Sequence, residues 1–119
     1  MDMLLTELPG TAIGVELAGR LDTLGVDAIE TRFNAGVLAA DRSALLDLSR
    51  VDFVSSMGVR LLITAAKTMK SRQQRLVLVV PAGPVREMLE VAAIDTLIPM
   101  FVQRDEALAA LAQIGRAHV

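Results

Sequence analysis

Apolar and polar residues alternate near the start of the chain. Met3–Leu8 is apolar with two polar residues interspersed, and Pro9-Gly10 follows with the residue types that a tight turn prefers at its centre. Over Ala12–Ala18 the alternation places the branched apolar side chains on one face, as in a strand with one buried face. The pattern therefore predicts an N-terminal β-hairpin.

The spacing changes after this hairpin. Gly19–Asp22 breaks the alternation, and from Val26 to about Ala39 the apolar residues recur at helical intervals. Asp22, Thr23 and Asp27 are all residues that cap helices well. We therefore expect a helix that starts near Val26, with one of these three side chains at its start.

The middle of the chain repeats this strand-then-helix order. Ser43–Leu48 contains a short apolar run suited to a strand that is covered on both faces, and we expect Phe53 and Val54 to extend it after an irregular segment. Two serines then precede a strongly helical stretch from Met57 to about Arg72. Its cations near the carboxyl end, Lys67, Lys70 and Arg72, are interpreted as a solvated helix face.

The last third of the chain continues the alternation of strands and helices. Leu76–Val80 is rich in branched residues and predicts an interior parallel strand. A helix over Val85–Ala92, a short strand near Met100–Val102 and a closing helix over Asp105–Ile114 follow. We therefore expect a single α/β domain over residues 1–119, with one mixed sheet layer, about four helices and right-handed crossovers.

The composition removes several kinds of chemistry. The chain has 119 residues, no cysteine and one histidine, His118, at the penultimate position. A thiolate metal site, a disulfide framework, a cysteine nucleophile and a histidine-based triad are thereby excluded within one chain. The carboxylates of Asp22, Asp47 and Asp52 lack the spacing of a metal site. We expect no catalytic residues, no metal and no cofactor.

Charge and hydropathy set expectations about partners. The formal net charge is −2 and aromatic residues make up 3% of the chain, so neither a basic footprint nor base-stacking platforms indicate nucleic-acid binding. No apolar run approaches the roughly 18 residues of a membrane span, and the first residues lack the basic region of a signal peptide. We therefore expect a cytoplasmic protein without membrane insertion.

The segment Leu46–Val59 resembles the signature of the STAS family, whose domains occur in sulfate transporter tails and in bacterial anti-sigma-factor antagonists. Gly19–Asp22 matches the earlier Gly-x-Leu-Asp element of the family. Leu76–Val80 and Pro84–Leu97 fall where the family has a later strand and its third helix. The resemblance covers nearly the whole chain and implies a STAS-like fold and a protein-binding role.

The resemblance also implies a set of site residues. In antagonists the loop before the second helix reads Asp-Ser-Ser/Thr-Gly, and its first Ser accepts phosphate from an anti-sigma-factor kinase. Here Ser55 stands at the Asp position, Ser56 at the phosphoacceptor and Met57 at the second hydroxyl. Ser55 is the competing acceptor. The residues implied in partner binding are Asp22, Ser55, Ser56, Met57, Gly58 and Arg60.

A hydroxyl at a helix N-terminus is a physically favourable place for phosphate. Unpaired backbone N–H groups and the positive end of the helix dipole face it, and Arg60 lies one turn further on. A phosphate adds about −1.5 to −2 charges and opposes docking of a partner there. The alternative interpretation is that Ser55 or Ser56 only caps the helix, which contributes about 1 kcal/mol. Asp22 likewise has a capping and a partner-binding interpretation.

Three functional hypotheses follow. The first is an anti-sigma-factor antagonist that binds an anti-sigma-factor serine kinase and is switched off by phosphorylation of Ser56. The second is a constitutive STAS adaptor or subunit of a transporter or signalling scaffold, favoured by the replacements at Ser55 and Met57. The third is a nucleotide phosphate held at the helix N-terminus, for which the chain has no glycine-rich phosphate loop.

Overall fold

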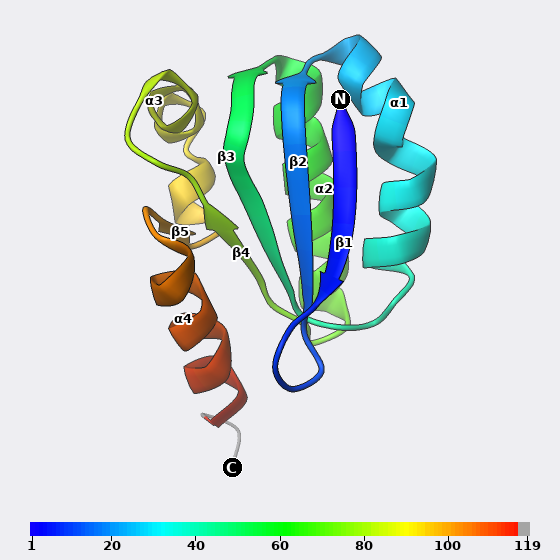
Figure 1. Ribbon diagram of the computed structural model, residues 1–119, viewed down its shortest axis with the longest axis vertical. Helices are drawn as coiled ribbons and strands as arrows, with labels where there is room; N and C mark the ends of the chain where they lie inside the picture. Colours follow the sequence, from blue (N-terminus) through cyan, green and yellow to red (C-terminus); the bar gives the residue numbers. More distant parts are fainter. Residues whose placement is uncertain (117–119) are drawn as a thin grey trace.

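A computed structural model describes the backbone of residues 1–116 and the side chains of residues 1–112. Its centre is a five-stranded sheet in the order β1-β2-β3-β4-β5 (Figure 1). The first two strands pair antiparallel and the remaining neighbours pair parallel, which confirms the predicted hairpin and mixed sheet. The strands are β1 (Asp2–Glu7), β2 (Ile13–Leu21), β3 (Ala44–Val54), β4 (Leu76–Val79) and β5 (Met100–Phe101).

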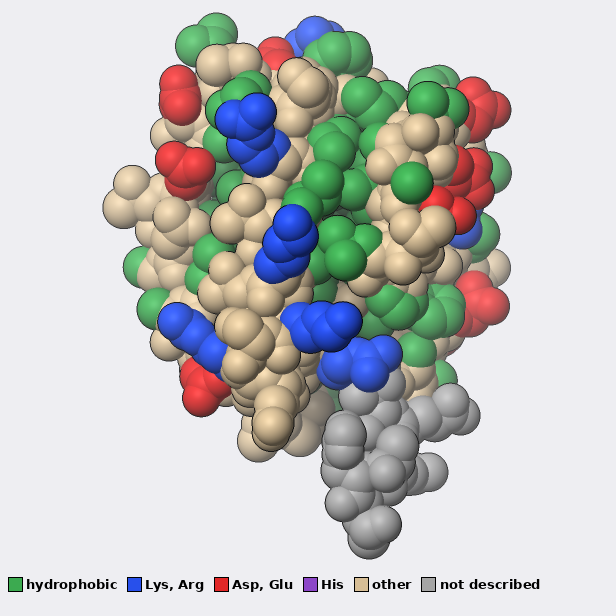
Figure 2. All heavy atoms as spheres, turned by 180° about the vertical axis from the view of Figure 1, so that it is seen from behind, with side chains coloured by type: hydrophobic (Ala, Val, Ile, Leu, Met, Phe, Trp, Pro, Cys, Tyr) green, Lys and Arg blue, Asp and Glu red, His purple; other side chains and the backbone are tan. Residues whose placement is uncertain are grey.

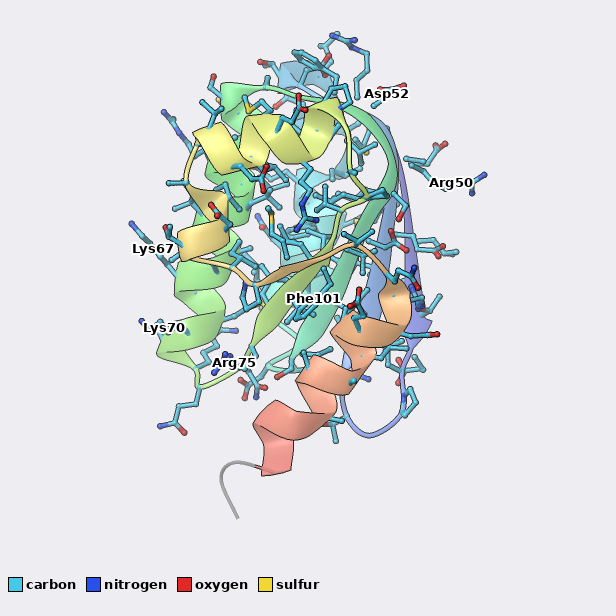
Figure 3. All side chains as sticks on the ribbon, turned by 90° about the vertical axis from the view of Figure 1, so that its left-hand side faces the viewer. Arg50, Asp52, Lys67, Lys70, Arg75 and Phe101 are labelled. Atoms are coloured by element: carbon cyan, nitrogen blue, oxygen red, sulfur yellow. The ribbon has the colours of Figure 1, made fainter. Side chains whose placement is uncertain are left out.

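Helices cover both faces of this sheet. One face carries α1 and α2, and α4 lies across the other face (Figures 1 and 3). The α-helices are α1 (Thr23–Phe33), α2 (Ser56–Ser71), α3 (Pro84–Val91) and α4 (Arg104–Arg116). Two short segments of other helix types are the π-helix η1 (Asn34–Leu38) and the 3-10 helix η2 (Ile94–Thr96). The described chain thus has the four α-helices that the sequence predicts.

The two faces bury cores of unequal size. The larger core packs the apolar face of α1, with Val26, Ile29 and Phe33, and the apolar face of α2 against β2, β3 and β4. The smaller core lies under α4, where Ala107 meets Leu45 and two valines of β4. The buried faces of α1 and α2 are the faces that the apolar spacing predicts, because only the apolar side chains gain free energy by leaving water.

Strand β3 differs from the prediction in being continuous. The sequence pattern places an irregular segment before Phe53, but the strand runs to Val54 without interruption. Its pairing with β2 contains two register shifts, between Glu16 and Ala18 and between Gly19 and Arg20. Each shift leaves one additional β3 residue opposite β2, as in a β-bulge, and so removes the strict alternation that marks a strand. The same shifts explain why β2 continues to Leu21, although the alternation in its sequence breaks at Gly19.

The helix boundaries also differ from the prediction. α1 begins at Thr23, three residues before Val26, and after Phe33 the chain continues as the π-helix η1. β4 ends one residue earlier than predicted, although the N–H of Val80 still donates to the carbonyl of Phe101 at 2.8 Å. α4 begins one residue before the predicted start. The side chain of Ile114 and all of His118 lie outside the described residues.

Candidate functional site

Two loops lie side by side at one edge of the sheet. Because β2 and β3 are parallel neighbours, the β2–α1 and β3–α2 connections leave from the same edge (Figure 1). Leu21 pairs with Val54 in the register, and the N–H of Ser55 donates to the carbonyl of Leu21 at 3.0 Å. The fold therefore brings Asp22 and Ser56, which are far apart in sequence, to adjacent loops.

Gly58 allows this close approach. A Cβ at this position would lie 2.5 Å from the carbonyl oxygen of Leu21 and 2.9 Å from its Cγ. Atoms in folded proteins do not pack so closely, so the first turn of α2 rests against the end of β2 only because residue 58 has no side chain. Gly58 is buried, and its role is to set the position of the Ser56 loop.

The two serines of the loop have different surroundings. Ser55 occupies the N-cap position of α2, but its hydroxyl donates to the carbonyl of Leu21 at 3.4 Å and makes no capping hydrogen bond. The prediction of a serine side-chain cap is therefore wrong, because the neighbouring strand end offers a competing acceptor. Ser56 is the first residue of α2, is exposed, and its hydroxyl makes no hydrogen bond within the described part of the chain.

The local charge around Ser56 favours an added anion. The first turn of α2 contains no acidic residue, and its free N–H groups and helix dipole place positive potential there. Arg60 follows four residues later, so it lies on the same helix face one turn away. Arg60 is exposed and pairs with no carboxylate among the described side chains.

Asp22 caps α1, as predicted. Its Oδ1 accepts a hydrogen bond from the N–H of Gly25 at 2.9 Å, and its Oδ2 lies 3.2 Å from Nε of Arg20. The Gly25 N–H lowers the pKa of Asp22 below its ordinary value, and Arg20 lowers this pKa further, against an opposing effect of burial. The Asp22 carboxylate is thus charged at neutral pH and holds its loop in one conformation.

The lowered pKa of Asp22 predicts a pH dependence of stability. Its contribution is present above the unfolded-chain pKa of about 3.9 and is lost as the pH falls through the lower folded value. We expect the free energy of unfolding to fall more steeply below about pH 4 in the wild type than in Asp22→Asn, which keeps a capping oxygen but does not titrate. Urea unfolding at a series of pH values measures this difference, and equal slopes would contradict it.

Three residues of this edge were not predicted from the sequence. The guanidinium of Arg20 stacks over the ring of Phe53 at 4.3 Å, and Phe53 remains 41% exposed. Leu24, in the first turn of α1, is 80% exposed. The sequence could have indicated Leu24, because a leucine on the side of α1 opposite the apolar face is expected to be exposed. Arg20 and Phe53 are opposite each other only through the second register shift, which the sequence does not reveal.

Met57 is not a freely exposed docking side chain. It is half-buried, packs against the larger core, and lines a cavity of about 140 Å³ between α1 and α2 together with Arg60. This cavity is smaller than typical ligand sites of about 300 Å³ or more. A hollow of about 490 Å³ lies between the β1–β2 turn and α4, and its lining shares no residue with either loop.

Two of the three aspartates considered for a metal, Asp22 and Asp47, have separate partners. Asp22 caps α1, whereas Asp47 lies 3.5 Å from Nη1 of Arg104, toward α4. In the part of the chain that the structure describes, no three His, Cys, Asp or Glu side chains gather at a point that would hold a metal ion. Within the same residues, no helix has both the length and the apolar character needed to cross a membrane.

Comparisons with known proteins agree on one family. The family model described as "Mlab, STAS domain" matches residues 4–100. A protein of Bordetella bronchiseptica, "Putative anti-sigma factor antagonist BtrV", is 30% identical over 110 residues, which cover 92% of this chain and 94% of that protein.

Solved structures show the same fold. An anti-sigma-factor antagonist (STAS) domain protein from Planctomyces limnophilus is 28% identical with a TM-score of 0.78, covering 92% of this chain and 97% of that one. An anti-sigma factor antagonist from Mycobacterium paratuberculosis is 22% identical with a TM-score of 0.83, covering 93% of each chain. The chain therefore belongs to the STAS domain family of anti-sigma factor antagonists.

Proposed function

We propose that this protein is a non-enzymatic cytoplasmic regulator that binds an anti-sigma-factor kinase and is switched off when Ser56 is phosphorylated. One observation carries the proposal: the exposed Ser56 hydroxyl shares an edge of the sheet with two exposed apolar side chains, Leu24 and Phe53. Unmodified, the protein holds the anti-sigma factor and so releases the sigma factor. The relatives described as anti-sigma factor antagonists support this assignment.

The chemistry of the edge suits protein docking. We name Arg20, Leu24, Phe53 and Ser56 the docking edge. Phenylalanine and arginine are enriched in protein interfaces, and the exposed leucine adds apolar surface that a partner can remove from water. The edge is held in place by the Asp22 cap and by the close contact at Gly58, so little conformational entropy is lost on binding.

Phosphorylation would oppose docking at the same place. A phosphate on Ser56 adds about −1.5 to −2 charges at the same edge of the sheet as Leu24 and Phe53, and a partner that covered the whole docking edge would have to remove this phosphate from water. The α2 N-terminus and Arg60 stabilise the phosphorylated form of the free protein. No change of fold is needed, because the modified hydroxyl is already exposed.

Truncation of Leu24 tests whether this edge docks the kinase. We expect Leu24→Ala to weaken binding of the purified anti-sigma-factor kinase from the same cell by tenfold or more, about 1.4 kcal/mol, in calorimetric titration. The matched control is Val91→Ala on α3, because Val91 is 88% exposed and belongs to neither loop. Stability should be nearly unchanged in both variants. Equal affinity of Leu24→Ala and the control would contradict docking at this edge.

A constitutive adaptor is the second candidate function. Ser55 and Met57 favour it, because one lacks the carboxylate and the other lacks the hydroxyl that antagonists carry in this loop. In that case the same edge would bind a transporter or scaffold subunit without regulation. Ser56→Glu separates the two candidates: kinase binding that is lost favours the antagonist, whereas unchanged partner binding together with co-purification of a transporter component favours the adaptor.

A further inference from the structure

The charges of the protein are unevenly distributed along the chain. Residues 53–86 contain six of the twelve Lys and Arg residues and none of the fourteen Asp and Glu residues. This segment therefore carries a formal charge of +6, while the rest of the chain carries −8. The small net charge of −2 hides a strongly basic segment, and that segment contains all of α2 and the candidate phosphoacceptor.

The fold gathers four of these six cations along one exposed face. From Ser56 to Lys70 the exposed positions of α2 recur every three or four residues, and these positions are Ser56, Arg60, Thr64, Lys67 and Lys70. Arg75 follows just after the helix. In Figure 2 basic side chains follow one another down this side of the molecule, with acidic ones toward its margins, and Figure 3 shows Lys67, Lys70 and Arg75 along the same side. We name Arg60, Lys67, Lys70 and Arg75 the basic stripe.

The stripe is free to bind. None of its four cations lies within ion-pair distance of a carboxylate among the described side chains. Some other cations are paired, as in Arg20 with Asp22 at 3.2 Å and half-buried Arg42 with Glu7 at 2.8 Å. Adjacent unpaired cations repel one another, and an opposite charge brought by a partner relieves that repulsion.

We infer that the basic stripe docks an acidic surface of the partner protein, alongside the docking edge. This inference rests on the proposed function and specifies the charge of the partner. The stripe begins one turn from Ser56 and spans much of α2, which is about 24 Å long, so one partner can cover the docking edge and the stripe together. Phosphorylation of Ser56 would then add a negative charge one turn from Arg60, where the stripe begins, and this charge would repel an acidic partner.

The features of the stripe favour a protein over other anionic partners. The exposed residues between its cations are Thr64, Ser71, Arg72 and Gln73, so the stripe itself presents no exposed apolar side chain of the kind that inserts into lipid. Phe33 is buried, Phe101 is half-buried, and Phe53 at the docking edge is the one exposed ring, so the series of stacking rings that single-stranded nucleic acid prefers is missing. A long polyanion would extend past the stripe onto the acidic remainder of the molecule.

Charge-reversal variants of the full chain test the inference. Lys67→Glu and Lys70→Glu each lower the net charge by two, and Arg50→Glu, which points away on the opposite side in Figure 3, is the matched control. We expect each stripe variant to weaken kinase binding by about tenfold at low salt and to reduce the salt dependence of the affinity, while Arg50→Glu stays within twofold. All three sites are exposed, so circular dichroism should show an unchanged fold.

The outcomes separate this inference from the proposed function. If wild type binds the kinase and the stripe variants bind equally well, the inference is overturned and the proposed function stands. If wild type binds no anti-sigma-factor kinase, the proposed function fails and the inference fails with it. Tighter wild-type binding to a 20-base-pair DNA duplex or to phosphatidylglycerol vesicles than to the kinase would overturn the assignment of a protein partner.

Discussion

Ser56→Ala is expected to accept no phosphate when the protein is incubated with its anti-sigma-factor kinase and ATP. The wild type and Ser55→Ala should both be modified, because the Ser56 hydroxyl is exposed and unengaged whereas that of Ser55 donates to the carbonyl of Leu21. Mass spectrometry of the intact chain and of its peptides measures the extent and place of modification. The difference between the two alanine variants should approach complete modification against none.

The pair of serine variants controls for indirect effects. Both substitutions remove one hydroxyl from the same loop, so a general disturbance of the loop would impair both. Modification of Ser56→Ala at Ser55 would assign the switch to the competing serine. If the wild type stays unmodified in the presence of an active kinase, the proposed phosphorylation switch is wrong.

Gly25→Ala is expected to destabilise the protein by about 2 kcal/mol or more. A Cβ on residue 25 would lie 2.0 Å from the carbonyl oxygen of Arg20, which is backbone and cannot turn aside. Overpacking of this kind costs about 3 kcal/mol, which exceeds the gain of about 1 kcal/mol from replacing glycine in a helix. Chemical denaturation measures the difference in the free energy of unfolding.

Gly36→Ala is the matched control for this prediction. Its added Cβ would also meet a close neighbour, at 2.7 Å, but that atom is the end of the half-exposed side chain of Leu5, which can rotate away. We therefore expect a change within about 0.5 kcal/mol. If Gly25→Ala is as stable as Gly36→Ala, the close contact between α1 and β2 does not exist as described.

The sequence predicted the parts of the fold that depend on regular periodicity. The apolar faces of α1 and α2 were found because burial on one side imposes a repeat, and β4 was found because burial on both faces leaves an unbroken branched run. The continuous β3 was missed because its two register shifts with β2 replace alternation by irregular spacing. Bulges depend on the partner strand, so a single strand's sequence does not disclose them.

The sequence predicted the two loops of the candidate site but not the exposed apolar side chains beside them. Asp22 was one of three capping candidates in the sequence, and a cap could be predicted because its side chain acts locally, within three residues. Leu24 and Phe53 join Ser56 only through the parallel register of β2 and β3. The serine cap failed for the same reason, since the acceptor that takes the Ser55 hydroxyl belongs to the neighbouring strand. Contacts between distant segments are what the sequence alone leaves open.

The phosphorylation switch is tested most directly by comparing two affinities of the purified anti-sigma-factor kinase, one for the unmodified chain and one for the chain phosphorylated at Ser56. Calorimetric titration with a non-hydrolysable ATP analogue prevents further modification during the measurement. We expect phosphorylation to weaken binding by tenfold or more, because the phosphate must lose water at the docking edge. Equal affinity of the two forms would contradict it.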